Sequence, residues 1–478
     1  MVMTQACKLN LPLRAHPSSS LEINSLLFEP ISQSLALMYS DSSFLLLPSP
    51  PIFTSSPSPS FPPSTLIPSP STSACFVRLH ASPNSTDGRV LFIVAGPHSG
   101  GSSILLRSWI LRKNQASFAK TQVSCSRSGL SCDHRLGVVV DLSHGFSVKL
   151  AGSVNVFALH SVSARKIFVF AAKMIGDEDD GVGVHLVKCA VIDCTLPICS
   201  MTILFGFLLL GEDNGVRVFP LRPLVKGRVH RQQELARRRD RKLDLPNGSI
   251  QTINGINDLY STKTMYSKHL VSGTDGNSAE QEGTTVSTNG YAKAEAHRDS
   301  AKLRTVKVKQ DSSECGTCFV SFKDPEVQSS KSTTLFSMPV KAAYIHALSP
   351  NKFLILDMVG DLHLLWLYNT VLGSEIKGHM RHLNHSMKVQ MLAVLPDISM
   401  RTQTVWVSDG FHSVHTMSIS DMDIPANEDV KNDVEEKQIQ ISAIQAIFAS
   451  EKIQDIVPLA ANAILILGQG NIFAYAIS

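Results

Sequence analysis

The residues best suited to bind another molecule form a basic run near the middle of the chain. Its members are Lys226, Arg228, Arg231, Arg237, Arg238, Arg239, Arg241 and Lys242. In an exposed, flexible segment such a run suits capture by a nuclear import receptor or by a phosphate-bearing polymer. It also fits a short solvated helix over residues 231–242 that only keeps the segment soluble. No aromatic residue interleaves the arginines, so base stacking has no platform and nucleic acid is the less favoured partner.

Cys315 and Cys318 have the spacing of a redox dithiol or of half a zinc site. Their flanks are a polar tail and a β-rich run, not the strand-to-helix context that lowers a thiol pKa, and no second pair completes a zinc site. A looser group is formed by Cys125, Cys132 and His134. The total of nine cysteines is odd and follows no framework, and we see no secretory signal. We therefore expect reduced, structural thiols in an intracellular protein.

Other candidate sites have simpler explanations. The segment Gly96–Ser103 resembles a phosphate-binding loop, but it lacks a lysine and leads into a strand, so we expect a hairpin turn. Asp177–Asp180 could attract a cation such as calcium, but we favour a solvated acidic turn. No Gly-x-Ser-x-Gly turn is present, and we expect His363 and His415 on third strands of their repeats. We predict no catalytic residue, no cofactor and no metal site, and hence a protein that is not an enzyme.

The composition provides ample material for a buried core that could position such residues. Of the 478 residues, 43% are apolar and 18% are charged. The formal net charge of +4 is small for a protein that coats nucleic acid. The stretch Cys189–Leu210 is apolar enough to imitate a membrane span, but it contains Asp193 and Pro197. We expect two core strands there and no membrane span.

A repeated unit dominates the chain: an apolar strand, a tight polar or glycine turn, and a second apolar strand. Asp-Gly, Gly-Asp and Gly-x-Gly turns supply the positive φ angles that a two-strand reversal needs. The predicted strand pairs are 34–39 with 44–47, 89–95 with 103–111, 154–160 with 166–171, 205–210 with 216–219, 352–357 with 362–366, 404–408 with 413–419, and 463–467 with 471–477. Apolar runs at 340–346, 388–394 and 453–458 are expected to add inner strands.

A ring accounts for these hairpins better than isolated units do. One hairpin cannot bury its apolar face, whereas four-stranded blades around an axis bury all of their faces. We therefore predict an all-β fold, a β-propeller with seven blades favoured over six or eight. Residues 1–225 would hold blades one to four and residues 334–478 blades five to seven. The segment Ala6–Leu13 is expected to complete the final blade.

Three segments have a composition that does not suit a core. Residues 48–73 are rich in proline and serine and are predicted to form an extended surface loop. Residues 226–333 are polar without periodicity, and we predict a disordered insert that contains the basic run. The acidic stretch Asp421–Glu436 is predicted to be another exposed loop.

The segment Ala347–Trp366, with its strand, Gly-Asp turn and second strand, resembles the second and third strands of a WD40-type blade. The chain has a Gly378-His379 dipeptide before an inner-strand candidate, but no Trp-Asp dipeptide closes a repeat. The resemblance is to a divergent WD40-like propeller, and the chain is also similar to uncharacterised plant propeller-like proteins. This resemblance implies a non-catalytic scaffold that binds other proteins.

Two alternatives to this function stay open at the level of sequence. One is a nuclear RNA-associated propeller that uses the basic run, and the other is a small-ligand or enzymatic propeller with a site in the central channel. We expect a nuclear or cytoplasmic protein. The first twenty residues contain no acidic side chain and end in serines, so a plastid transit peptide is the alternative.

Overall fold

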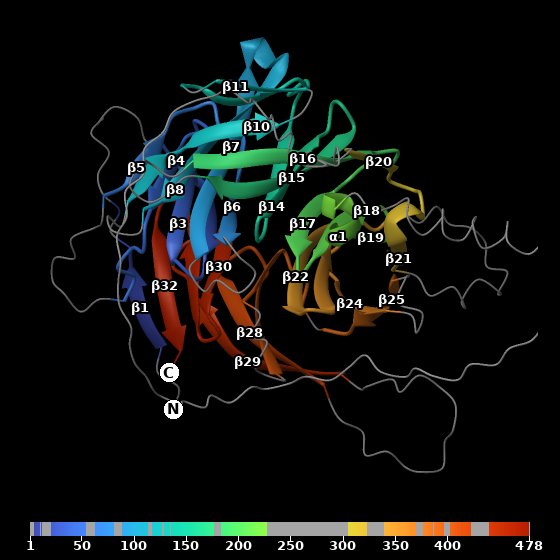
Figure 1. The fold of residues 1–478 in the computed structure, drawn as a ribbon. Coiled ribbons are helices and arrows are strands. Elements are labelled where there is room, and N and C mark those ends of the chain that lie inside the picture. The colour runs from blue at the N-terminus through green and yellow to red at the C-terminus, as the bar shows by residue number, and fades with distance from the viewer. Residues whose placement is uncertain are drawn as a thin grey trace, which may run out of the picture. The chain divides into compact units, whose positions relative to one another are not determined.

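Seven β-sheets form the computed structural model, each one a blade of a propeller (Figure 1). The chain divides into two compact units, Met1–Val229 with Leu303–Ser478, and His230–Lys302. The propeller is the first unit, and the second lies outside the described residues. The residues described are 4–9, 11, 21–53, 63–80, 88–112, 117–126, 129–133, 135–175, 183–226, 305–322, 339–369, 376–385, 387–395, 402–421 and 439–477.

The first four blades are built mainly from residues 23–220, and blades 3 and 4 each add one strand from residues 306–321. Blade 1 contains β2 (Ile23–Glu29), β3 (Ser34–Tyr39), β4 (Phe44–Leu47) and β5 (Thr65–Ile67). Blade 2 contains β6 (Ser73–His80), β7 (Gly88–His98), β8 (Ser103–Leu111), β9 (Phe118–Lys120), β12 (Gly137–Val140) and β11 (Leu130–Asp133). Blade 3 contains β13 (Val148–Gly152), β14 (Val156–Ser161), β15 (Lys166–Ile175) and β16 (Gly183–Asp193), joined by β10 (Gln122–Ser126) and β20 (Val306–Lys309). Blade 4 contains β17 (Ser200–Leu204), β18 (Phe207–Glu212), β19 (Gly215–Pro220) and β21 (Cys318–Ser321).

The other three blades are simple four-stranded sheets. Blade 5 contains β22 (Ala342–Ser349), β23 (Lys352–Asp357), β24 (Leu362–Asn369) and β25 (Ile376–Leu383). Blade 6 contains β26 (Met391–Val394), β27 (Thr402–Ser408), β28 (Ser413–Asp421) and β29 (Ile439–Phe448). Blade 7 contains β30 (Asp455–Ala460), β31 (Ala463–Leu467), β32 (Ile472–Ile477) and β1 (Thr4–Lys8). Helix α1 (Leu221–Lys226) follows β19, and short 3₁₀ turns lie at Ser99–Gly101 and Glu314–Gly316.

The seven predicted hairpins are the two middle strands of the seven blades, so this prediction is confirmed. The turns have the expected chemistry, since Gly360 and Gly410 have φ angles of 93° and 77°. Strands such as β3 and β31 are buried on both faces, because each face packs on a neighbouring blade. Hence these strands are continuous apolar runs without the alternation of a half-exposed sheet.

Seven clusters of buried apolar side chains join the blades, one at each junction. At the junction of blades 1 and 2, the rings of Phe44 and Phe92 lie 5.7 Å apart, edge to face. At the junction of blades 6 and 7, Trp406 shares a cluster with Ile464. The first strands of the blades contact one another in the cyclic order β2, β6, β13, β17, β22, β26, β30 and back to β2. The blades therefore form a closed ring.

The two ends of the chain close this ring together in blade 7. Strand β1 pairs antiparallel with β32, from Thr4 opposite Ile477 to Lys8 opposite Phe473. Leu9, just after β1, is buried in the cluster between blades 7 and 1. The prediction that the N-terminal segment completes the final blade is confirmed, although the strand begins at Thr4.

Two of the predicted loops contain strands, which corrects their boundaries. Strand β5 lies inside residues 48–73 and pairs with β4, and its Ile67 is fully buried. Strands β20 and β21 lie inside residues 226–333 and pair with β16 and β19. These strands are short and take their pairing edges from distant segments, so local composition does not reveal them. Residues 227–304 and 422–436 lie outside the described part of the chain.

The expectation that all cysteines are reduced is wrong for one pair. Cys125 on β10 and Cys132 on β11 form a disulfide, with their Cα atoms 6.2 Å apart. β10 pairs with blade 3 and β11 with blade 2, so the bond joins strands of neighbouring blades. Sequence spacing alone could not show that these strands lie side by side. In Cys189–Leu210 the two expected core strands are present as β17 and β18, preceded by β16, and no helix of the described residues is long and apolar enough to span a membrane.

Candidate functional site

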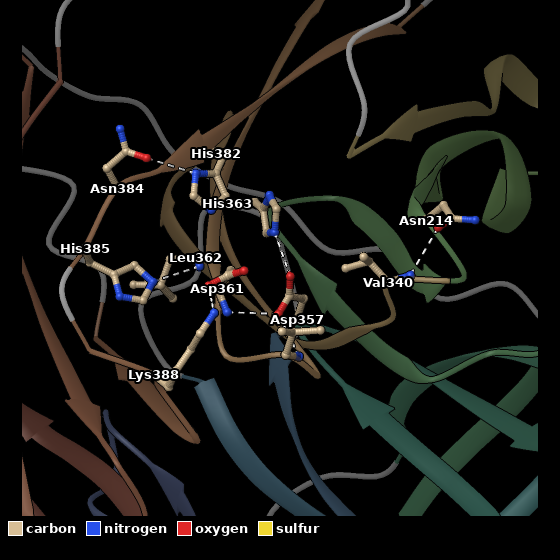
Figure 2. Close-up of polar contacts among 11 residues, drawn as sticks. Asn214, Val340, Asp357, Asp361, Leu362, His363, His382, Asn384, His385 and Lys388 are labelled. Atoms are coloured by element: carbon tan, nitrogen blue, oxygen red, sulfur yellow. Dashed lines mark hydrogen bonds and ion pairs between the residues drawn. The ribbon is translucent and has the colours of Figure 1, made fainter. Parts of the chain in front are cut away.

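A carboxylate organises the turn between β23 and β24 in blade 5 (Figure 2). Oδ1 of Asp357 accepts hydrogen bonds from the backbone N–H groups of Val359 and Asp361, each at 2.9 Å. Gly360 provides the positive φ angle that this tight turn needs. The turn is therefore fixed by its own sequence, and it holds the side chains around it at defined positions.

Asp357 also holds a buried histidine on the next strand. Nε2 of His363 donates to Oδ2 of Asp357 at 2.9 Å, and both side chains are buried. The His363 ring packs on Phe322 and His382, with centroid separations of 4.3 Å and 5.2 Å. Burial lowers the pKa of His363, and the Asp357 carboxylate opposes this lowering.

The Asp357–His363 pair has the residue types of two members of a catalytic triad. Its geometry, however, suits a structural role. Nε2 of His363 is engaged by the carboxylate, and Nδ1 is buried with no hydrogen-bond partner among the described residues. Neither ring nitrogen is open to a substrate, which a general base must reach within hydrogen-bond distance. The pair therefore ties β23 to β24.

A polar rim surrounds this turn at the surface (Figure 2). Lys388, in the connection from blade 5 to blade 6, forms an ion pair with Asp361, and its hydrogen bond lowers the pKa of that carboxyl. The backbone N–H of Leu362 donates to Nε2 of His385 at 3.2 Å. Burial lowers the pKa of His385, which favours the neutral ring that can accept this bond. The connection is thus docked on the turn.

A groove of about 400 Å³ opens next to this rim. It is lined by Met387, Lys388, Gln390, Asp409, Phe411, His415, Met417 and Ala443. Apolar side chains with polar groups at a few positions are typical of surfaces that accept a side chain of a ligand or partner. His415 lies on the third strand, β28, as predicted, and Nε2 of its ring is 3.1 Å from the hydroxyl of Ser413.

Exposed apolar side chains lie on the turns of blades 5 and 6 beside the groove. Met358 and Val359 in the β23–β24 turn are 62% and 57% exposed, and Phe411 in the β27–β28 turn is 55% exposed. The ammonium of Lys452 lies 5.9 Å from the centroid of the Phe411 ring. We call these four residues, together with the groove, the blade 5/6 surface. Apolar side chains rimmed by polar groups are typical of sites that bind other proteins.

The structure describes only one member of the predicted basic run. Lys226 is exposed at the end of α1, and Leu221 and Leu224 of this helix are buried between blades 3 and 4. The other seven members, Arg228, Arg231, Arg237, Arg238, Arg239, Arg241 and Lys242, lie outside the described residues. The predicted role of the run therefore stays a prediction.

A buried polar network lies close to the point where the described chain resumes at residue 305, inside the predicted insert. Arg217 forms two hydrogen bonds with Glu212, at 2.6 Å and 2.9 Å, and Gln310 donates to the same carboxylate at 2.7 Å. Oε1 of Gln310 accepts the backbone N–H of Leu196 at 2.8 Å. Because the side chains of Arg217, Glu212 and Gln310 all form hydrogen bonds, the network holds the residues after β20 firmly against blade 4.

The remaining predicted candidates have structural positions or are not described. Gly96–Ser103 forms the end and turn of the β7–β8 hairpin, as expected. Cys315 and Cys318 are half-buried, in the connection to β21 and in β21 itself. Among the described residues, no group of His, Cys, Asp and Glu could hold a metal ion. Asp177–Asp180 lie outside the described part.

Sequence reasoning missed the Asp357–His363 pair and the Gln310 network. An aspartate three residues before the turn glycine, with a histidine three residues after it, is a local signal that could have pointed to the pair. The contact of His363 with Phe322 had no such signal, because Phe322 belongs to the residues that were assigned to the insert.

Known proteins that resemble this chain are solved structures of low sequence identity. No family model and no curated protein matches the chain, so the similarity to plant propeller-like proteins stays a prediction. Similar solved structures include the RRP9 WD40 repeats (8% identity, 100% of both chains, TM-score 0.39). The WD40 domain of SCAP from fission yeast has 11% identity over 95% of this chain and 84% of that chain, with a TM-score of 0.36. U3-55K has 8% identity over 98% of each chain, with a TM-score of 0.38. On the evidence of its strand pairings and blade junctions, the chain is a seven-bladed β-propeller, and the solved structures it resembles include WD40-repeat propellers.

Proposed function

We propose that this protein is a non-catalytic scaffold that binds a segment of another protein at the blade 5/6 surface. The observation that carries the proposal is the set of exposed apolar side chains, Met358, Val359 and Phe411, on rigid turns beside a groove. An apolar side chain of the partner would enter the groove against Phe411 and Met417. Exposed Lys388 and Lys452 would favour acidic residues next to it.

Turns that are already rigid favour binding at the blade 5/6 surface. The Asp357 hydrogen bonds and the docking of Lys388 and His385 hold the turns before a partner arrives. Binding then orders few groups, and less of the interaction free energy is lost to conformational entropy. The fold itself is used by many binding proteins, but the assignment of function rests on this surface.

Affinity purification with a matched control tests the proposal. The double variant Met358→Ser with Phe411→Ser removes two exposed side chains of the blade 5/6 surface. The control, Ile31→Ser with Leu66→Ser, removes side chains that are 70% and 55% exposed in blade 1. We expect recovery of specific partners, measured by quantitative mass spectrometry, to fall about tenfold in the first variant only. Equal recovery with both variants would show that this surface does not bind partners.

We further propose that the basic run Arg237–Lys242 acts as a nuclear import signal. The support is its composition and its place in the predicted insert, which begins at Lys226, the exposed end of α1. A fluorescent fusion in which Arg237, Arg238 and Arg239 become alanine should lose nuclear accumulation, whereas Lys307→Ala in β20 should not. Plastid fluorescence would favour the transit-peptide alternative. Salt-dependent RNA binding that disappears in the triple variant would favour the RNA-associated alternative.

A further inference from the structure

The outermost strand of blade 6 is unusual in length. β29 has ten residues, whereas β25, β1, β21 and β5, which end blades 5, 7, 4 and 1, have eight, five, four and three. Ten residues of extended chain span roughly 33 Å. Within the described residues no strand pairs with the outer edge of β29. This edge is therefore a long row of backbone donors and acceptors.

The sequence of β29 lacks the features that usually protect such an edge. Charged residues, proline or short length usually prevent an exposed edge from pairing with another chain, because an unprotected edge is a template for another strand. Residues Ile439–Phe448 contain no charged residue and no proline, whereas β25 carries Lys377 and Arg381. Ile444 and Phe448 are 60% and 76% exposed. As far as the chain is described, the edge is thus both unpaired and apolar.

The outer strand of blade 3 is also long, and there two added strands cover its edge. β16 is the fourth strand of blade 3 and has eleven residues. β10 pairs with it from Gly183 to Val187, and β20 pairs with it from Ala190 to Asp193. The fold therefore tolerates a fifth strand at the rim of a blade, and it supplies one where the outer strand is long.

We infer that the outer edge of β29 pairs with the same edge of a second copy of this chain, as an antiparallel ladder about a twofold axis. A self-complementary edge needs only one sequence, and the absence of charge in β29 means that no like charges meet. Ile444 lies near the middle of the strand, so the axis brings the two Ile444 side chains together. Phe448 of each copy would lose its exposure as well.

The strand pairing also accounts for an irregularity in β29. The register between β28 and β29 shifts between Thr416 and Met417, and Ile444 is the residue without a partner on β28. A bulge re-aims a side chain at a sheet edge. Here it leaves Ile444 outside the blade, at the centre of the proposed contact. The contact is small, so we expect a weak dimer that forms in the micromolar range.

Sedimentation velocity of the full-length protein tests the inference. Between about 1 and 100 μM, the wild type should change from monomer to dimer, a range that corresponds to a micromolar dissociation constant. The variant Ile444→Lys with Phe448→Lys should stay monomeric, because charges would face each other across the axis. The control Ile31→Lys with Tyr368→Lys alters equally exposed apolar residues elsewhere and should dimerise like the wild type.

Hydrogen exchange provides a second measurement that needs no substitution. Backbone amides of Ile439–Phe448 should exchange several-fold more slowly at 100 μM than at 1 μM, while those of β25 should not change, over the range that populates a micromolar dimer. A wild type that is monomeric throughout the range, or amide protection that does not depend on concentration, would overturn the inference. A lysine variant that folds and still dimerises would overturn it too, since another surface would then be responsible.

Discussion

Some single buried residues in this propeller form hydrogen bonds with more than one element and so hold neighbouring strands together. Asp357 satisfies two backbone donors of its own turn and a histidine on the next strand. Removing a buried carboxylate leaves its donors without their hydrogen bonds, which costs more than those bonds contribute on balance. Exposed pairs, by contrast, are screened by water and contribute little.

This difference predicts unequal effects of two neighbouring aspartates. Asp357→Ala should lower the free energy of unfolding by about 2–4 kcal/mol, because three donors lose their acceptor. Asp361→Ala removes only the exposed ion pair with Lys388 and should cost below about 1 kcal/mol. Urea unfolding followed by tryptophan fluorescence would measure both values. Equal losses for the two variants would contradict the structural role given to Asp357.

Asp455 connects the first and last blades at the point where the ring closes. Oδ2 accepts the backbone N–H of Leu26 at 2.8 Å, and Oδ1 accepts that of Ile456 at 2.9 Å. Burial nevertheless raises the pKa of Asp455 from 3.8 to about 6. The folded state therefore holds this proton more tightly than the unfolded state does.

The sign of the resulting pH dependence follows from that raised pKa. The contribution of Asp455 to stability is fully present below about pH 4 and is lost as the pH rises to about 6. At about 1.4 kcal/mol per pKa unit, the loss is about 3 kcal/mol at most. In Asp455→Asn this contribution should be missing, so the difference in melting temperature between variant and wild type should change between pH 4 and pH 7. A constant difference across that range would count against the shifted pKa.

At the scale of elements, the strands divide into those that form from local signals and those that depend on distant partners. The middle hairpins of the blades belong to the first kind, since a Gly or Asp turn sits between apolar runs. β5, β10, β20 and β21 belong to the second kind, because three to five residues carry too little periodicity to be recognised. This is why the sequence predicts the ring, its hairpins and its closure, but places two loop boundaries wrongly.

The residues of the candidate site divide in the same way, into those that local sequence predicts and those that depend on distant segments. The turn at Gly360 and the position of His415 on a third strand were predicted, because both belong to a middle hairpin. The groove requires residues from β28, β29 and two connections, and their approach is set by the packing of blade 6 on its neighbours. Only the assembled structure brings Met387 and Ala443 together.

The described residues around β20, inside the predicted insert, offer a test at this scale. Gln310→Ala should remove one hydrogen bond to Glu212, which keeps those from Arg217, and should leave the backbone N–H of Leu196 without its acceptor; each lost bond is worth about 1 kcal/mol or more. We expect amides of β20 to exchange about tenfold faster, as measured by mass spectrometry. Ser312→Ala removes a hydroxyl from the following turn and serves as the control. Unchanged exchange in β20 would show that the network does not secure this strand.

For the whole molecule, stability depends on a closed circle of junctions. Each blade buries its two faces on its neighbours, and the junction of blades 7 and 1 depends on the segment that starts the chain. Loss of one junction exposes two apolar faces at once. The ring is therefore expected to unfold as one unit.

Deleting residues 4–9 should show this dependence. The deletion removes β1 and Leu9, so β32 gains an open edge and the cluster between blades 7 and 1 loses a buried side chain. We expect a fall in melting temperature of roughly 10 °C or more, together with a broader transition. Cys7→Ala keeps the backbone of β1 and should melt like the wild type. A deletion variant with an unchanged melting temperature would mean that β1 is dispensable for closure.

The pairing of β1 with β32 also determines when the ring can close during synthesis of the chain. β1 ends at Lys8 and β32 begins at Ile472, so 463 residues lie between the two partners. At a synthesis rate of about 5–20 residues per second, β1 waits roughly 25–90 s for its partner. During this interval every growing chain is an open arc with unpaired ends. Chaperones that hold such arcs, and proteases that remove them, would act on this protein mainly before its last strand has been made.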